Sequence, residues 1–179
     1  MITWKFGLET TQHILLVPPF YENLGKRIVK SPKVHFVDSG LACHLLGIDT
    51  EAQLRRSPFL GPLFEGFVAS EIVKAQLNAG RRKEIYHFRD HQGLEVDFLI
   101  PRGPRSVALV EAKASRTVVP AMALPLTRTA KAMSRYDVTT HVVHPDLLPT
   151  ADVAASVALA PGVTALPVGR IAALVARRR

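Results

Sequence analysis

The first apolar positions of the chain come in short runs separated by polar and basic residues. Residues 14–21 and 34–38 are two such runs, and they predict two short strands joined by a basic connection. After the second run, Asp38 or Ser39 is placed to cap a short helix that ends at Gly47. The pattern therefore predicts a small mixed segment at the start of the chain.

A loop over residues 51–61 should lead into a long amphipathic helix. Pro62 is placed for the start of this helix and Gly80 for its end, with an apolar stripe between them that predicts packing on a sheet. Two acids disturb the stripe, Glu65 at its border and Glu71 near its centre. A carboxylate that faces a core needs a partner or a metal, so either acid is a candidate ligand.

The second half of the chain alternates between strand and helix patterns. Residues 84–89 and 94–100 predict a hairpin, and the continuously apolar run from Val107 predicts a central strand that is covered on both faces. A helix over about residues 121–136 and a strand at 138–144 should follow, with a final strand and a short helix after them. The order is helix, three strands, helix, strand, which is typical of an α/β fold.

Composition and charge narrow the classes of partner and compartment. The 179 residues include 23 Lys and Arg against 15 Asp and Glu, a formal charge of +8 that favours polyanions such as nucleic acid, although many soluble domains are simply basic. With Cys43 as the single cysteine, no disulfide within the chain and no cysteine-based zinc site can form. No stretch is typical of a secretory signal or a membrane-spanning helix, so we expect a soluble cytoplasmic protein.

The candidate chemistry lies on the two strands after the long helix. Glu95 and Asp97 share one face of a strand, and Glu111 and Lys113 share one face at the end of the next. If Asp97 approaches Glu111, the two carboxylates repel each other unless a cation lies between them, and Mg²⁺ or Mn²⁺ prefers such oxygen ligands. An ordinary ion pair between Glu111 and Lys113 is the alternative.

Asp97, thirteen intervening residues and then Glu111-Ala112-Lys113, placed after a helix with Glu65, resemble the motif of the PD-(D/E)XK nuclease superfamily. Val96 stands where the superfamily name has proline. Four ordered blocks resemble, more specifically, the uncharacterised C-terminal domain of a bacterial and archaeal family of AAA-type ATPases. These blocks are KSPKVHFVDSGLACHLLG, LFEGFVASEIVK, YHFRDHQGLEVDFLI and VEAKAS.

This resemblance implies a fold and a division of the chain. It implies a restriction-endonuclease-like core of α-β-β-β-α-β order, in which helices flank a mixed central sheet, over residues 61–179. Residues 1–60 would then be an N-terminal extension with a winged-helix-like remnant and a connecting helix. No phosphate-binding G-x-x-x-x-G-K-[ST] loop occurs in the sequence, so the chain itself should not hydrolyse ATP.

The resemblance also implies roles for single residues. Asp97, Glu111 and Glu65 would bind Mg²⁺ or Mn²⁺, and Lys113 would be the catalytic lysine. Arg89 would contact phosphate. We also predict nucleic-acid contacts, with DNA as the expected partner, from the basic cluster Arg81, Arg82 and Lys83.

Three hypotheses remain open at this point. The chain is a metal-dependent DNA endonuclease or nuclease-like domain, or it is a non-catalytic module that binds nucleic acid or an ATPase partner. The third is that it is a fragment whose apolar N-terminal face belongs against a missing domain. Neither the choice between DNA and RNA nor that between Glu65 and Glu71 as the helix ligand follows from the sequence.

Overall fold

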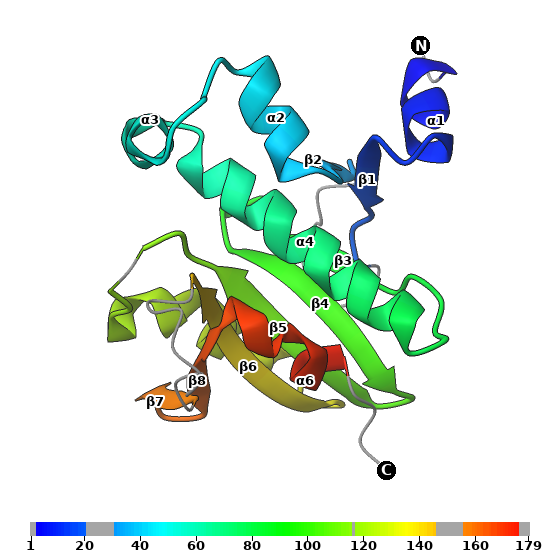
Figure 1. Cartoon of the computed structure of the whole chain (residues 1–179). Coiled ribbons are helices and arrows are strands. Elements are labelled where there is room, and N and C mark those ends of the chain that lie inside the picture. The colour runs from blue at the N-terminus through cyan, green and yellow to red at the C-terminus, as the bar shows by residue number, and fades with distance from the viewer. Residues whose placement is uncertain (1–2, 21–30, 116, 146–155, 176–179) are drawn as a thin grey trace.

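Two β-sheets and the helices packed on them make up the fold in the computed structural model, which describes residues 3–20, 31–115, 117–145 and 156–175 (Figure 1). The elements of the N-terminal third are α1 (Thr3–Thr10), β1 (Ile14–Val17), β2 (Lys33–Phe36), α2 (Ser39–Leu45) and α3 (Glu51–Arg56). The remaining elements are α4 (Leu60–Asn78), β3 (Tyr86–Arg89), β4 (Glu95–Gly103), β5 (Ser106–Ala112), α5 (Leu124–Ala132), β6 (Asp137–His144), β7 (Val157–Ala160), β8 (Val163–Pro167) and α6 (Ile171–Val175).

The larger sheet has six strands in the order β3-β4-β5-β6-β8-β7. The pairs β3–β4, β4–β5 and β7–β8 are antiparallel, whereas β6 runs parallel to both β5 and β8. This confirms the expectation of an α/β fold with a mixed sheet. It also confirms that β5 is a central strand, because its residues 107–111 are all buried.

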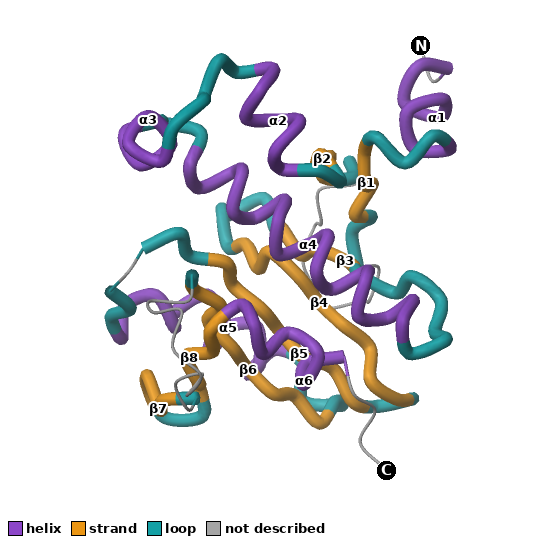
Figure 2. The backbone as a smooth tube through the Cα atoms, in the orientation of Figure 1, coloured by secondary structure: helices purple, strands orange, loops and turns teal. Residues whose placement is uncertain are grey.

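Helices cover both faces of this sheet. Figure 2 shows α4 and α6 in front of it and α5 behind it. The front core joins Val68 and Ile72 of α4 to Phe98 and Val110 of the sheet. The rear core is built around Leu126 of α5 and its neighbours. Because strand side chains alternate between faces, β4 and β5 supply apolar side chains to both cores.

The smaller sheet is the antiparallel β1–β2 pair, which lies beside α4 (Figure 1). Its Val17 is fully buried in the same core as α4. Two backbone hydrogen bonds join the segment after β1 to β3: His87 N–H donates to the Pro18 carbonyl (3.0 Å), and Phe20 N–H donates to the His87 carbonyl (2.8 Å). The N-terminal third is thus attached to the six-stranded sheet through β3.

Most predicted elements are present, with four differences. The sequence predicted no element before residue 14, where the structure has α1. The loop expected over residues 51–61 contains α3, which begins with a capping box between Thr50 and Gln53. Helix α4 begins at Leu60, two residues before Pro62. Strand β7 was not expected, because its four residues are half-exposed or exposed and show no alternation.

Some predictions fall outside what the structure tests. The division at residues 60 and 61, the winged-helix-like remnant and the endonuclease-like details of the core stay predictions. Much of the basic connection between β1 and β2, residues 21–30, lies outside the described residues. Among the described helices, none combines the length and the apolar character needed to cross a membrane.

Candidate functional site

Asp97 and Glu111 lie at the end of the sheet where β4 begins and its antiparallel neighbour β5 ends. The Asp97 Oδ2 atom accepts a hydrogen bond from the backbone N–H of Ala112 (3.0 Å), the residue next to Glu111. Strand β4 carries one extra residue between Val96 and Leu99 relative to β3. Such a bulge re-aims side chains, and here it accompanies an Asp97 that is buried against the neighbouring strand.

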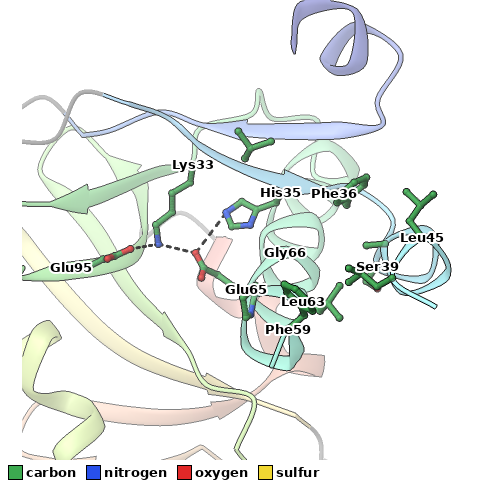
Figure 3. A pocket seen from close by; sticks show the side chains of 14 residues that line it. Lys33, His35, Phe36, Ser39, Leu45, Phe59, Leu63, Glu65, Gly66 and Glu95 are labelled. Atoms are coloured by element: carbon green, nitrogen blue, oxygen red, sulfur yellow. Dashed lines mark hydrogen bonds and ion pairs between the residues drawn. The ribbon is translucent and has the colours of Figure 1, made fainter. Parts of the chain in front are cut away.

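Lys33 of β2 lies in the middle of three carboxylates from two other elements. Its Nζ atom is 2.8 Å from Glu65 Oε1, 2.5 Å from Glu95 Oε1 and 3.0 Å from Asp97 Oδ1. Figure 3 shows the Lys33 side chain between Glu65 and Glu95. An ammonium group has three N–H donors, so Lys33 can serve all three carboxylates at once.

Helix α4 presents Glu65, and not Glu71, to this site. Glu71 pairs with Lys74 on the same helix, at the surface. The Nε2 atom of His35, also on β2, lies 3.7 Å from Glu65 Oε1 (Figure 3). This buried nitrogen has no hydrogen-bond partner among the described residues. The helix acid of the site is therefore Glu65.

Glu111 and Lys113 form the second half of the site. Lys113 Nζ donates to Glu111 Oε1 (2.7 Å). The Glu111 side chain is only 9% exposed, and its other oxygen, Oε2, has no hydrogen-bond partner in the described part of the chain. A buried carboxylate oxygen without a partner costs free energy, so the site has unused capacity for a donor or a cation.

The electrostatics of the site follow from burial and close charges. Burial and then repulsion by Asp97 raise the pKa of Glu111 to about 7. The same two causes raise the pKa of Glu65. Burial and the adjacent Lys33 lower the pKa of His35 to about 4, so its ring is neutral at pH 7. Although burial opposes it, attraction to Asp97 and Glu65 raises the pKa of Lys33, which stays charged.

We call Glu65, Glu95, Asp97 and Glu111 the acid cluster. Its four carboxylates contact two ammonium groups, those of Lys33 and Lys113, and at its exposed rim Arg89 Nε is 3.6 Å from Glu95 Oε2. The donor set is made of hard oxygens, as Mg²⁺ and Mn²⁺ require. Among the described residues, however, no three His, Cys, Asp or Glu side chains stand in a metal-holding arrangement.

A cavity of about 560 Å³ opens beside the acid cluster, between β2, α2 and the first turns of α4 (Figure 3). Lys33, Glu65 and Glu95 line its polar end. The other walls are mainly apolar and include Phe36 and Phe59, both more than 40% exposed. Lys33 is the single Lys or Arg of its lining, so the cavity does not resemble a phosphate-binding groove.

The predicted nucleic-acid contacts are spread over the surface. Arg89 is exposed at the rim of the acid cluster, and Arg82 is exposed beyond the end of α4. Lys83 pairs with Glu9 of α1 (3.0 Å). The guanidinium of Arg81 donates to the carbonyls of Val175 and Pro101 and is mostly buried, so it fastens α6 to β4. Arg81 therefore has a structural role, and we do not propose it as a nucleic-acid contact.

The predicted residues Asp97, Glu111, Lys113 and Glu65 are brought to one end of the sheet. Sequence reasoning missed Lys33 and His35, and it paired Glu95 with Asp97 without assigning it a role. Both missed residues are on β2, two positions apart, so they share one face of that strand. That spacing was visible in the sequence, but nothing in it placed β2 against the acid cluster.

Comparisons with known proteins identify relatives without an established function. A family described as a domain of unknown function (DUF4143) matches residues 60–153, and another (DUF8612) matches residues 3–52. Uncharacterized proteins of Mycobacterium bovis and Mycobacterium tuberculosis are each 40% identical to the chain over 82 residues. These residues are 46% of this chain but 18% of each relative, so the chain spans about a fifth of the curated relatives it matches. No solved structure matches it.

Proposed function

The chain belongs to the DUF4143 family, which is typically found in AAA-ATPase-associated proteins, and we propose that it is a metal-dependent, nuclease-like domain that acts on DNA. One observation carries this proposal. Asp97, Glu111, Lys113 and Glu65, from two strands and a helix, lie together at one end of the sheet. Paired carboxylates with an adjacent lysine suit the neutralisation of charge on a phosphodiester.

The acid cluster would hold the cation, through Asp97 and Glu111 with Glu65 from the helix. A bound Mg²⁺ or Mn²⁺ would neutralise phosphate charge and lower the pKa of a bound water. Lys113 is already charged and half-buried, and its Nζ atom donates a hydrogen bond to Glu111. It is therefore positioned to stabilise negative charge on a phosphate beside the acid cluster.

Cleavage of DNA tests this proposal. The full chain is incubated with supercoiled plasmid and Mg²⁺ or Mn²⁺, beside Asp97→Asn, Lys113→Met and Glu65→Gln. We expect each of these changes to lower the cleavage rate by about 100-fold or more, as does the loss of an electrostatic catalytic group elsewhere. Glu71→Gln is the matched control, because Glu71 is on the same helix as Glu65 but outside the acid cluster. Cleavage that survives Asp97→Asn, or no cleavage by any form, would refute the proposal.

A second function is favoured by a specific observation. Lys33 already pairs with Asp97, Glu65 and Glu95, and the adjacent cavity is mainly apolar. Both features fit a non-catalytic module that binds nucleic acid or an ATPase partner. For such a module we expect DNA binding that weakens with salt and does not depend on Mn²⁺. Binding measured by fluorescence anisotropy with EDTA and with Mn²⁺ separates the two functions.

A further inference from the structure

The three carboxylates around Lys33 face one point, and an ammonium group occupies it. The contacts of Nζ with Glu65, Glu95 and Asp97 lie between 2.5 and 3.0 Å, so all three N–H donors are used. These oxygens come from α4 and from the start of β4. A cation that bridged the same oxygens could not be present together with the Lys33 ammonium.

The carboxylates of this site outnumber the cations that contact them, even with the exposed Arg89 guanidinium at Glu95 included. Four carboxylates contact the two ammonium groups of Lys33 and Lys113, and Glu111 Oε2 is buried without a hydrogen-bond partner in the described residues. A divalent cation would neutralise more of the excess negative charge than the ammonium does.

Lys33 also has space into which it can move. Its side chain is a four-carbon stem on β2, and it lines the cavity of about 560 Å³ beside the acid cluster. Rotation about the bonds of this stem would move the ammonium out of the acid cluster without a change in the β2 backbone. Side-chain rotations of this kind are fast compared with collective motions of the backbone.

We propose that Lys33 is a tethered cation that competes with a divalent metal ion for Glu65, Glu95 and Asp97, so that metal binding requires its ammonium to leave the acid cluster. The inference rests on the proposed function, since it assumes that the acid cluster is a metal site. It adds Glu95 to the ligands and makes Lys33 the residue that sets metal affinity. The described conformation is then the metal-excluding state of the site.

Calorimetric titration with MnCl₂ tests the competition. Lys33→Met should bind Mn²⁺ about tenfold more tightly than the unchanged chain, or more, because the competitor is gone. Lys33→Arg keeps the charge and should bind as weakly as the unchanged chain. Lys74→Met is the matched control, because Lys74 is an exposed lysine outside the acid cluster. Adding Asp97→Asn to Lys33→Met should abolish binding.

The outcomes separate this inference from the proposed function. Equal Mn²⁺ affinity of Lys33→Met and the unchanged chain would overturn the competition and leave the metal site, and the proposed function, standing. No Mn²⁺ binding by any variant would overturn both. Lys33→Met should also melt at a lower temperature without metal, because three carboxylates lose their partner, and Mn²⁺ should restore the melting temperature.

Chemical labelling of the unchanged chain keeps the test decisive if Lys33→Met fails to fold. The Lys33 side chain is 18% exposed, whereas that of Lys74 is 56% exposed. Lysine acetylation followed by mass spectrometry should therefore modify Lys74 readily and Lys33 slowly. Mn²⁺ should increase the modification of Lys33 and leave that of Lys74 unchanged. Lys33 labelling that does not respond to Mn²⁺ would count against the proposal.

Discussion

Glu111 combines burial with a neighbouring negative charge, and this makes protein stability depend on pH. Its folded-state pKa, about 7, is raised above the ordinary carboxyl value of 4.5, so its contribution to stability is complete below pH 4.5 and is lost as the pH rises to 7. Glu111→Gln cannot ionise. From pH 5 to pH 8, urea unfolding should therefore show this variant gaining about 2 kcal/mol relative to the unchanged chain.

Comparing Glu111→Gln with the unchanged chain at each pH removes the effects of titrating groups that both proteins contain. His35 has the opposite sign, because its lowered pKa makes stability fall as the pH drops from 6.5 to 4, but it is present in both proteins. Glu71→Gln serves as the control, since Glu71 is paired at the surface. A Glu111→Gln stability that runs parallel to that of the unchanged chain would contradict the assigned pKa.

Protonation of Glu111 should also control the affinity of the acid cluster for a metal ion. Metal ligands must be deprotonated, and with a pKa of about 7 Glu111 is mostly protonated at pH 6 and mostly ionised at pH 8. Mn²⁺ binding should thus be about tenfold tighter at pH 8 than at pH 6, measured by calorimetry in buffers of equal ionic strength. Glu111→Gln should lose most of this dependence. Equal affinities at the two pH values would mean that Glu111 is not a ligand.

Single residues differed in how far the sequence could predict them. Asp97, Glu111 and Lys113 were identifiable because alternation along a strand and their position at a strand end are local properties. Lys33 was not, because its role depends on β2 being placed near Asp97, which lies sixty-four residues later in the chain. Local sequence also could not decide between Glu65 and Glu71 as the helix acid of the site, because the answer depends on which side of α4 faces the sheet end.

At the scale of elements, Gln76 joins the end of α4 to the segment that leads into β3. Its buried side chain donates to the Glu84 carbonyl (2.9 Å) and accepts from the Glu84 N–H (3.0 Å). Gln76→Leu removes both hydrogen bonds and leaves two backbone groups without partners. We expect it to lower the free energy of unfolding by about 2 kcal/mol, measured by urea denaturation.

Asn78→Ala is the control for this change. Asn78 is an exposed residue in the same turn of α4, so removal of its amide group should change the free energy of unfolding by less than about 0.5 kcal/mol. If Gln76→Leu were as mild as Asn78→Ala, water would be replacing the side chain at Glu84. The two hydrogen bonds would then not be needed to hold α4 to β3.

The elements that the sequence missed are short ones. Helix α3 has six residues and none that is buried, so it has no apolar stripe, and its signal was the spacing of Thr50 and Gln53 in a capping box. The extra residue of β4 beside Asp97 carries no sequence signal. Longer elements such as α4 and β5 were predicted because burial imposes a pattern over many residues.

At the scale of the whole molecule, the chain order of elements followed from the sequence, but their spatial order did not. Local periodicity identifies a strand without naming its neighbours. The placement of β8 between β6 and β7 and the attachment of the β1–β2 pair to β3 are long-range contacts. The acid cluster depends on both scales, because its carboxylates come from α4, β4 and β5 while Lys33, which pairs with three of them, comes from β2 in the N-terminal third of the chain.

If the chain binds DNA as proposed, its net charge of +8 favours binding that weakens as salt rises. Each phosphate contact by a cation contributes about 0.9 to the slope of log affinity against log salt, so Arg82→Gln should reduce the slope by about that amount. Arg56→Gln is the control, because Arg56 is exposed on α3, near the opposite end of α4. Anisotropy titrations on duplex DNA at several salt concentrations measure both. Equal slopes for the two variants would exclude Arg82 from the interface.

The attachment of residues 18–20 to β3 has a consequence for self-association. The outer strand of a sheet offers unpaired backbone groups as a template for aggregation. At His87 the N–H and the C=O are both engaged by Pro18 and Phe20, so a foreign strand cannot dock there in register. At the opposite rim, β7 has only four residues, Val157–Ala160, and offers a short template. The N-terminal segment thus blocks the β3 edge of the larger sheet at His87, and the shortness of β7 limits pairing at the opposite edge.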